Sequence, residues 1–211
     1  IMNDLMSLGM HRLWKKRFVE TVNIKENEII LDVGSGSGDI ASEILKENLS
    51  TSLYLLDLNE EMLLKGRKRL RKEKNIKYFI GNAEKLNFEN NFFDKYTISF
   101  CLRNVTEYLL SIKEAYRVLK PGGKYCCLEF STPKSSLISS SYKIYKSKIL
   151  PLLGEIVAKD KNAYKYLSES IDLFPSQEEL SKNLRDCGFT NVETINPVSY
   201  THLTLPTIQP V

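Results

Sequence analysis

The chain has 211 residues, of which 42% are hydrophobic and 27% charged, and its net charge is +4 at neutral pH. These values are ordinary for a globular α/β domain and give no support for a nucleic-acid partner, although they permit attraction to an anionic membrane surface. No apolar run approaches 18 residues, so no segment is predicted to span a bilayer.

The cysteines indicate the redox compartment of the protein, and the first residue bears on whether its N-terminus is complete. None of the four cysteines (Cys101, Cys126, Cys127 and Cys187) belongs to a Cys-x-x-Cys pair, which indicates a reducing compartment. No signal or transit peptide is recognisable, and the start at Ile1 predicts a sequence truncated at that end.

Residues 2–22 are predicted to form a helix with one apolar stripe facing the core. Lys15, Lys16 and Arg17 are expected on the opposite, solvated side. His11 and Trp14 either pack in the core or border a ligand. The stripe consists of Leu5, Met6, Leu13, Trp14 and Phe18.

The next segment has the pattern of strand, glycine turn and helix. Ile29–Val33 is apolar and β-branched, three glycines follow at alternate positions from Gly34, and 39–45 has helical spacing. Glycines let the backbone pass close under a ligand, and the helix offers free N–H groups. The G-x-G-x-G spacing, with Asp32 two residues earlier, is typical of S-adenosylmethionine methyltransferases; the alternative is a plain glycine turn.

The charges around the glycines favour a cationic ligand. A pyrophosphate would require Lys or Arg near the turn, but 34–45 contains only Asp39 and Glu43. We therefore expect these two carboxylates to suit the sulfonium of S-adenosylmethionine better than a phosphate.

The second strand, Ser52–Asp57, ends in a carboxylate 19 residues after Gly38. An acid at this position can accept hydrogen bonds from both ribose hydroxyls of a nucleoside, which predicts a binding role for Asp57. Its alternative role is to cap the helix that begins near Asn59. That helix is predicted to run to about Lys74, with its many cations on a solvated outer face.

Three more strands are predicted at Ile76–Ile80, Phe93–Phe100 and Lys124–Phe130, with a helix at Ser111–Leu119 closed by the Lys-Pro-Gly-Gly turn. This alternation predicts an α/β fold with a doubly wound sheet and binding sites at the carboxyl ends of its strands. The polar candidates at such ends are Ser37, Asp57, Asn82, Ser99, Arg103 and Glu129.

Residues 131–175 interrupt the alternation and are predicted to form a helical cap over the substrate. Within it, the apolar and lysine-rich stretch 144–153 either forms a membrane-interfacial patch or packs in the core. Asp160 and Tyr164 are weaker candidates for substrate contact. A helix at Ser176–Cys187 with a capping box, and a sixth strand at 191–196, follow.

Several motifs together resemble the ubiquinone/menaquinone-biosynthesis C-methyltransferase family, over about residues 1–198. The glycine motif and the Leu-Lys-Pro-Gly-Gly turn occur in many methyltransferases, whereas the N-terminal, Arg-Asn-Val and cap motifs are more restricted. The matching segments are Met2–Gly9, His11–Lys15, Asp32–Asp39, Ser99–Thr106, Arg117–Gly123 and Tyr164–Pro175.

The resemblance implies a class I, Rossmann-like methyltransferase sheet with helices on both faces and S-adenosyl-L-methionine as the cofactor. Ser37 stands where relatives commonly have Thr, which keeps the hydroxyl. No metal site is expected. The predicted cofactor-binding residues are Asp32, Gly34, Gly36, Ser37, Asp57, Asn82, Ala83 and Ser99.

The family reaction is methylation of a ring carbon of 2-methoxy-6-polyprenyl-1,4-benzoquinol, of demethylmenaquinol or of both. The ring carbon becomes nucleophilic only as a neighbouring hydroxyl loses its proton. Arg103 is a poor base because guanidinium stays protonated, so its predicted role is to stabilise phenolate charge, with a water as proton acceptor. Its alternative role is to fix the loop through backbone carbonyls. Asn104 orients the hydroxyl or holds the loop.

The prenylated quinol substrate implies work at a membrane surface, on the cytoplasmic side of a bacterial inner membrane or in the mitochondrial matrix. A homodimer or a quinone-synthesis complex is a further expectation. Two rival functions remain open: methylation of another small molecule, and a non-catalytic cofactor-binding subunit that helps such a complex assemble. The glycine spacing disfavours an NAD oxidoreductase.

The chain is predicted to form one domain over 1–200, followed by an atypical tail over 201–211. Relatives continue into a seventh strand, but Pro206 and Pro210 each remove a backbone donor, and no glycine follows Gly188. We expect the seventh strand to be missing or malformed, the tail to be foreign to the family, and His202 to have no catalytic role.

Overall fold

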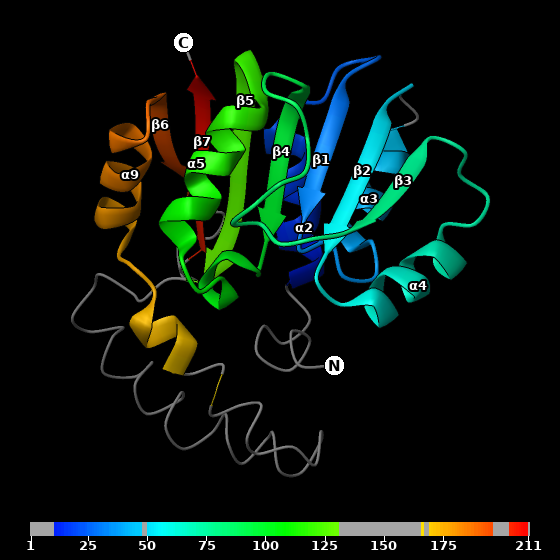
Figure 1. The fold of residues 1–211 in the computed structure, drawn as a ribbon, viewed down its shortest axis with the longest axis horizontal. Helices are drawn as coiled ribbons and strands as arrows, with labels where there is room; N and C mark the ends of the chain where they lie inside the picture. The colour runs from blue at the N-terminus through cyan, green and yellow to red at the C-terminus, as the bar shows by residue number, and fades with distance from the viewer. Residues whose placement is uncertain (1–10, 48–49, 131–165, 167–168, 196–202, 211) are drawn as a thin grey trace.

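The computed structural model describes residues 11–47, 50–130, 166, 169–195 and 203–210, the last range by its backbone. Its centre is a seven-stranded sheet in the order β3-β2-β1-β4-β5-β7-β6, in which β7 pairs antiparallel with both β5 and β6 and the pairs among β1 to β5 are parallel (Figure 1). The predicted doubly wound α/β fold is confirmed.

The strands are β1 (Ile29–Val33), β2 (Ser52–Asp57), β3 (Ile76–Ile80), β4 (Phe93–Ser99), β5 (Leu119–Phe130), β6 (Phe189–Ile195) and β7 (Leu203–Pro210). The helices are α2 (His11–Val22), α3 (Asp39–Ile44), α4 (Glu60–Arg69), α5 (Tyr108–Val118) and α9 (Gln177–Asp186), with 3-10 turns η1 (Leu45–Glu47) and η2 (Leu102–Asn104). Among the described helices, none has the length and apolar content needed to cross a bilayer.

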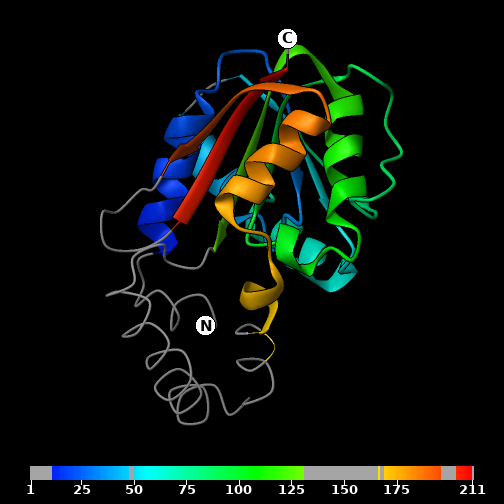
Figure 2. The same ribbon diagram turned by 90° about the vertical axis from the view of Figure 1, so that its left-hand side faces the viewer.

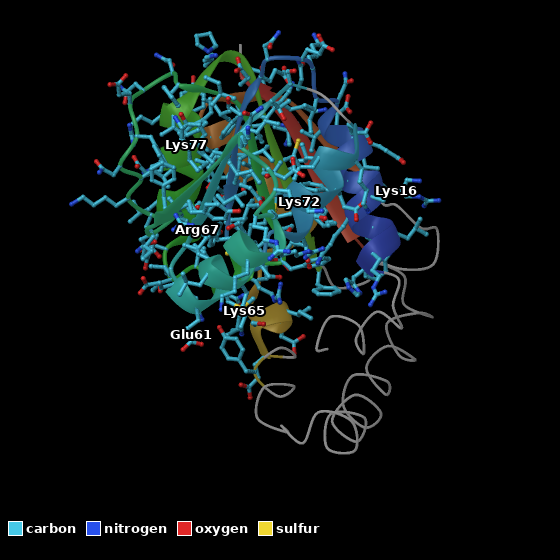
Figure 3. The ribbon with its side chains drawn as sticks, turned by 90° about the vertical axis from the view of Figure 1, so that its right-hand side faces the viewer. Lys16, Glu61, Lys65, Arg67, Lys72 and Lys77 are labelled. Carbon is cyan, nitrogen blue, oxygen red and sulfur yellow. The ribbon has the colours of Figure 1, made fainter. Side chains whose placement is uncertain are left out.

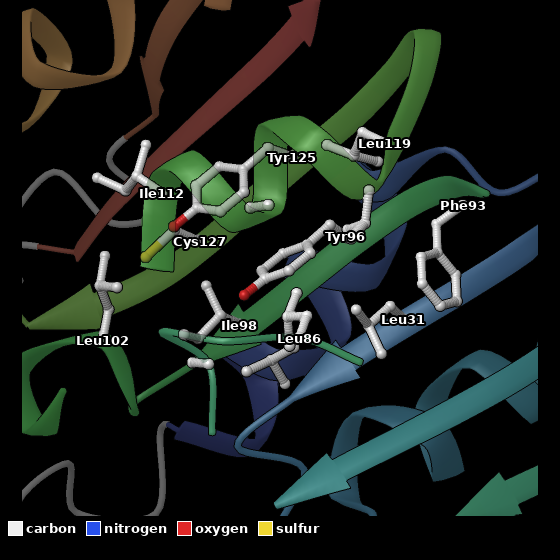
Figure 4. Packing of buried hydrophobic residues seen from close by; sticks show 14 of the residues in the cluster. Leu31, Leu86, Phe93, Tyr96, Ile98, Leu102, Ile112, Leu119, Tyr125 and Cys127 are labelled. Carbon is white, nitrogen blue, oxygen red and sulfur yellow. The ribbon is translucent and has the colours of Figure 1, made fainter. Parts of the chain in front are cut away.

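Two apolar layers cover the sheet, one on each face. α2, α3 and α4 contribute Trp14, Phe18, Ile40 and Leu63 to one layer. α5 and α9 contribute to the other, so that α2 and α9 lie on opposite sides of the sheet in Figure 2. Tyr96 of β4 and Tyr125 of β5 stack in this second layer with their ring centroids 5.2 Å apart (Figure 4), which fixes the two central strands side by side.

Several element boundaries differ from the predicted ones. α4 ends at Arg69 rather than near Lys74, and β5 begins at Leu119, before the Pro-Gly-Gly turn rather than after it. Leu119 pairs with Phe93, and the pairing resumes at Lys124 beyond an irregularity, because the turn takes up extra residues along one strand. The N-cap role predicted for Ser176 is confirmed, since the Glu179 N–H donates to Ser176 Oγ at 3.2 Å.

The predicted buried and exposed faces of α2 agree with the structure only in part. Trp14 and Phe18 are buried as expected, but Leu13 is 44% exposed and Lys15 is buried. Lys15 is buried because its ammonium group reaches the Asp39 carboxylate, which offsets the loss of water. Residues 2–10 lie outside the described residues, as do 131–165 with the interfacial stretch, Asp160 and Tyr164.

The prediction of a missing or malformed seventh strand is wrong. Leu203–Pro210 is a strand paired with β5 on one side and β6 on the other. Thr204 and Thr207 are paired with β5, but Pro206 between them is not, because it has no N–H to donate. Pro206 is paired with Thr194 of β6 instead. Antiparallel ladders bond only alternate residues to each neighbour, which lets the sheet accommodate the prolines. The foreign origin of the tail stays a prediction, and His202 lies outside the described residues.

Candidate active site

A cavity of about 350 Å³ opens at the carboxyl ends of β1, β2, β3 and β4. β1 and β4 are neighbours although β2 and β3 come between them in sequence, so the strand order reverses here, as at ligand sites of other open α/β sheets. The lining consists of Val33, Gly34, Leu56, Asp57, Leu58, Gly81, Asn82, Ala83, Glu84, Phe100, Cys101, Asn104, Val105 and Thr106.

The glycine turn is held tightly against the loop that follows β4. Gly34 has a φ of +63°, and a Cβ atom built on it would lie 2.2 Å from the Sγ atom of Cys101. Cys101 reaches this position because the chain bends at Phe100, whose φ of +52° is rare for a bulky side chain. A glycine is therefore required at position 34 both for its backbone angle and for its lack of a side chain.

Asp57 joins the glycine turn to the start of α4. Its Oδ2 atom accepts a hydrogen bond from the Gly36 N–H at 2.7 Å, and its Oδ1 atom accepts one from the Asn59 N–H at 2.8 Å. The capping of α4 falls instead to Asn59, whose Oδ1 atom accepts from the Met62 N–H at 3.2 Å. The carboxylate is thus fixed at the cavity wall with a lone pair left on each oxygen, which suits two neighbouring hydroxyls.

We expect Asp57→Ala to weaken S-adenosylmethionine binding roughly tenfold or more, because a charge-assisted hydrogen-bonding group contributes about 1.5–3 kcal/mol. Calorimetry on the purified chain measures this. Glu84→Gln is the matched control, since it removes a second carboxylate from the same cavity and keeps its shape. Unchanged affinity in Asp57→Ala, or an equal loss in Glu84→Gln, would contradict a specific role for Asp57.

Asn82 and Glu84 form the wall at the end of β3. Asn82 Oδ1 accepts from the Glu84 N–H at 2.9 Å, and Glu84 Oε1 accepts from the Glu107 N–H at 3.0 Å. These bonds tie the loop after β3 to the start of α5, so both side chains keep fixed positions at the cavity.

Asp32 lies buried at the end of β1, beneath the cavity rather than in its lining. Thr97 Oγ1 donates to its Oδ1 atom at 2.8 Å, whereas the Oδ2 atom has no hydrogen-bond partner among the described residues. Burial raises the pKa of Asp32 to about 7, since the Thr97 hydrogen bond lowers it less and the Asp57 charge raises it further.

The raised pKa predicts a pH-dependent affinity for a cationic ligand. As the pH rises through about 7, Asp32 loses its proton and gains a negative charge that attracts a cation nearby. S-adenosylmethionine affinity measured between pH 6 and 8 should therefore rise with pH in the unaltered chain and vary less in Asp32→Asn. Parallel pH profiles for the two proteins would rule out this role for Asp32.

Folding stability should change in the opposite direction. The folded-state pKa of Asp32 lies above the ordinary value of 3.8 for this carboxyl group, so the folded state holds the proton more tightly than the unfolded state between these two values. The contribution of Asp32 to stability therefore falls as the pH rises from about 4 to about 7.

Arg103 does not line the cavity. Its side chain is only 6% exposed and its guanidinium pairs with Glu129, which also accepts from the Arg103 backbone N–H at 3.3 Å. The guanidinium lies over the Phe130 ring at 5.4 Å, and its Nε atom is buried with no partner among the described residues. Burial raises the pKa of Glu129, and the Arg103 charge opposes that rise. Asn104, the next residue, does line the cavity and accepts from the Tyr166 hydroxyl at 3.4 Å.

The predicted site residues thus fall into three groups. Five of them come together in the cavity lining: Gly34, Asp57, Asn82, Ala83 and Asn104. Two lie just outside the lining, where the Gly36 N–H donates to Asp57 and Asp32 is buried below. The other three, Ser37, Ser99 and Arg103, are not part of the lining. Sequence reasoning missed several lining residues that lie one or two positions after a strand or a predicted site residue. Their closeness in sequence to these positions could have predicted that they line the cavity. These residues are Leu58, Glu84, Phe100, Cys101, Val105 and Thr106.

The predicted pairing of Asp39 with a sulfonium is not supported by its position. Its carboxylate binds Lys15 and Arg69 in a second cavity, away from the first lining. Burial raises the pKa of Asp39, but the hydrogen bonds and charges of Lys15 and Arg69 outweigh this and lower it to about 2. In the part of the chain that the structure describes, no cluster of His, Cys, Asp or Glu is arranged to hold a metal.

Comparison with known proteins gives a family match. The model of the ubiE/COQ5 methyltransferase family matches residues 1–204. The chain is 48% identical over 204 residues to proteins of Rickettsia bellii (strain RML369-C) and Rickettsia prowazekii (strain Madrid E), both called ubiquinone/menaquinone biosynthesis C-methyltransferase UbiE. Each alignment covers 93% of this chain and 82% of the relative.

Solved structures share the fold at low sequence identity. A SAM-dependent methyltransferase from Aquifex aeolicus is 18% identical with a TM-score of 0.70, covering 100% of this chain and 99% of the other. A possible histamine N-methyltransferase from Thermotoga maritima is also 18% identical, with a TM-score of 0.66 and coverage of 99% and 93%. These likenesses support the Rossmann-like methyltransferase fold.

Proposed function

Because this chain belongs to the ubiE/COQ5 methyltransferase family, we propose that it transfers the methyl group of S-adenosyl-L-methionine to a ring carbon of a polyprenylated quinol in ubiquinone/menaquinone biosynthesis. The substrate is 2-methoxy-6-polyprenyl-1,4-benzoquinol, demethylmenaquinol or both. The 48% identity to the Rickettsia enzymes is what supports this choice among methyl-transfer reactions.

The single observation that carries the cofactor assignment is the charge of the first cavity. Its lining contains two carboxylates, Asp57 and Glu84, and no Lys, Arg or His. Such a lining attracts a cation and disfavours a pyrophosphate. The buried, unpartnered Oδ2 atom of Asp32 adds a further acceptor beneath the cavity floor.

The residues of the site also fit the rest of the cofactor. Asp57 would hold the ribose hydroxyls, Asn82 and Ala83 would border the base, and the Gly34–Gly36 turn would pass under the amino-acid end. A volume of about 350 Å³ lies at the lower end of the range typical of small-molecule sites.

In the proposed mechanism the bound cofactor supplies an electrophilic methyl group on a sulfonium sulfur. The hydroxyl beside the ring carbon would first lose its proton, and the negative charge that grows on its oxygen would make the carbon nucleophilic. The carbon would then take the methyl group as the methyl–sulfur bond breaks with its electron pair on sulfur. Finally the ring carbon would release its own hydrogen as a proton while the oxygen regains one, so that one proton is lost overall. Asn104 at the cavity wall would orient that hydroxyl. Arg103 directly precedes the lining residue Asn104, and it would stabilise this charge from behind the cavity wall, where its guanidinium pairs with Glu129. A water would take the proton.

The test uses the purified chain with labelled S-adenosylmethionine and offers both reduced quinones side by side. We expect label on a ring carbon of at least one quinol. Methylation of neither quinol, with turnover of an unrelated small molecule, would favour the first rival function. Cofactor binding without any turnover would favour the non-catalytic assembly subunit.

We further propose that the reaction takes place at a membrane surface, because the polyprenyl tail of the substrate is lipid-soluble. The bacterial relatives support the cytoplasmic side of a bacterial inner membrane over the mitochondrial matrix. A homodimer or a quinone-synthesis complex is part of the same proposal, and size measurements on the purified chain and on cell extracts test it.

A further inference from the structure

A second cavity, of about 590 Å³, lies between α2, α3 and the C-terminal end of α4. Asp39 borders it and directly follows Gly38, so this cavity and the first one lie on two sides of the same glycine turn. Its lining holds five cations against two carboxylates. The cations are Arg12, Lys15, Lys16, Lys46 and Arg69.

Three of these cations pair with the two carboxylates of the lining. Lys15 and Arg69 share the carboxylate of Asp39, and Lys46 pairs with Glu43 at 2.6 Å. Three cations thus meet two carboxylates, and Lys16 in the same lining adds a further positive charge. A surplus of this kind attracts an anion.

The positive charge extends beyond the cavity over the neighbouring helices. Residues 11–22 carry four cations and one carboxylate, residues 39–47 carry one cation and three carboxylates, and residues 60–74 carry seven cations and three carboxylates. The three segments together have a net charge of +5, compared with +4 for the whole chain. Figure 3 looks onto this side, where Lys16, Lys65, Arg67 and Lys72 are labelled. We call the cations of these three segments, with the second cavity, the basic face.

Exposed leucines lie among these cations. Leu13 on α2 is 44% exposed and borders the second cavity, Leu64 on α4 is 48% exposed, and Leu58 just before α4 is 69% exposed and borders the first cavity. Apolar side chains beside cations are typical of surfaces that lie on anionic bilayers, where the leucines enter the headgroup region. A site for free phosphate or nucleic acid gains little from exposed leucines.

We propose that the basic face binds an anionic phospholipid bilayer, with the phosphate of one headgroup in the second cavity. This inference rests on the proposed function, since it names the surface by which the enzyme reaches a lipid-soluble quinol. Leu58 lies just before α4, beside the basic face, and borders the first cavity, so the bilayer would meet the molecule beside the methyl-transfer site.

Vesicle flotation of the full chain tests the proposal. We expect binding to vesicles of equal parts phosphatidylglycerol and phosphatidylcholine, and little binding to phosphatidylcholine alone. Lys16→Gln with Lys72→Gln should weaken binding about 30-fold, because each surface cation contributes about 1 kcal/mol. The matched control is Lys113→Gln with Lys182→Gln, two exposed lysines on α5 and α9 across the sheet, which should change binding less than twofold.

A second pair of variants identifies the ligand. Leu13→Ser with Leu64→Ser should weaken vesicle binding while leaving the binding of duplex DNA unchanged. Binding of inorganic phosphate or duplex DNA without binding to anionic vesicles would overturn the proposal, as would equal losses in the test and control lysine pairs. Methyl transfer to a short-tailed, water-soluble quinol should remain normal in these variants, which separates a failure of this inference from a failure of the proposed function.

Discussion

Replacing Arg103 with Ala should lower the methyl-transfer turnover by roughly 10²–10³, the scale of losing one group that stabilises transition-state charge. Cofactor affinity should stay within about twofold, because Arg103 lies outside the lining of the first cavity. Single-turnover kinetics together with calorimetry separate the two effects. Normal turnover with lost cofactor affinity would reverse the roles that we assign.

The ion pair with Glu129 requires a control for stability. Arg103→Ala alone leaves Glu129 buried without its cation, and such an uncompensated charge is strongly destabilising. In the double variant Arg103→Ala with Glu129→Gln no buried charge remains, so folding should recover while turnover stays low. If the double variant regains turnover as well as stability, Arg103 only ties down the loop, which was its alternative role.

Replacing Gly34 with Ala should destabilise the fold by about 2–5 kcal/mol. Overpacking contributes about 1–3 kcal/mol of this and a left-handed backbone at a non-glycine residue about 1–2 kcal/mol. The clash is with the side chain of Cys101, which lies 2.2 Å from the new Cβ position. Chemical denaturation measures the change, and cofactor binding should fall because the turn borders the first cavity.

Cys101→Gly is the matched partner for this variant. It removes both Cys101 atoms that clash, and the nearest Cys101 atom left, its Cα, is 4.0 Å from the added methyl group. In a double-mutant cycle the second substitution should recover the overpacking part and leave the backbone part. Additive effects of the two substitutions would mean that the close approach of Gly34 to Cys101 does not determine the stability of the turn.

The parts of the site that were predicted from the sequence depend on local patterns. A β-branched run before alternate glycines fixes both a strand and the turn after it, so Gly34 and Asp57 could be placed at the carboxyl edge without knowing any other contact. Asn82 and Asn104 followed from the same rule that loops after parallel strands meet at one edge.

The parts that were missed depend on contacts between residues far apart in sequence. Lys15 is buried because Asp39, 24 residues later, provides the opposite charge, and the heptad-like pattern of α2 contains no sign of that partner. The guanidinium of Arg103 lies buried and paired because Glu129, 26 residues later, provides its opposite charge. The proline rule excluded a seventh strand because it considers each proline alone, whereas in the sheet Pro206 and Pro210 are both paired with β6 and neither is paired with β5.

The position of β7 also constrains the order in which the sheet can assemble. β5 and β6 each lie beside β7 and are not neighbours of one another, yet both precede β7 in the chain. They can therefore join one sheet only after the later segment has entered between them. Such pairing closes long loops, which slows folding, and until it happens β5 exposes an unpaired edge to other chains. Synthesis and refolding are thus expected to pass through a stage in which the parallel half, with the first cavity at its carboxyl edge, forms before the sheet is complete.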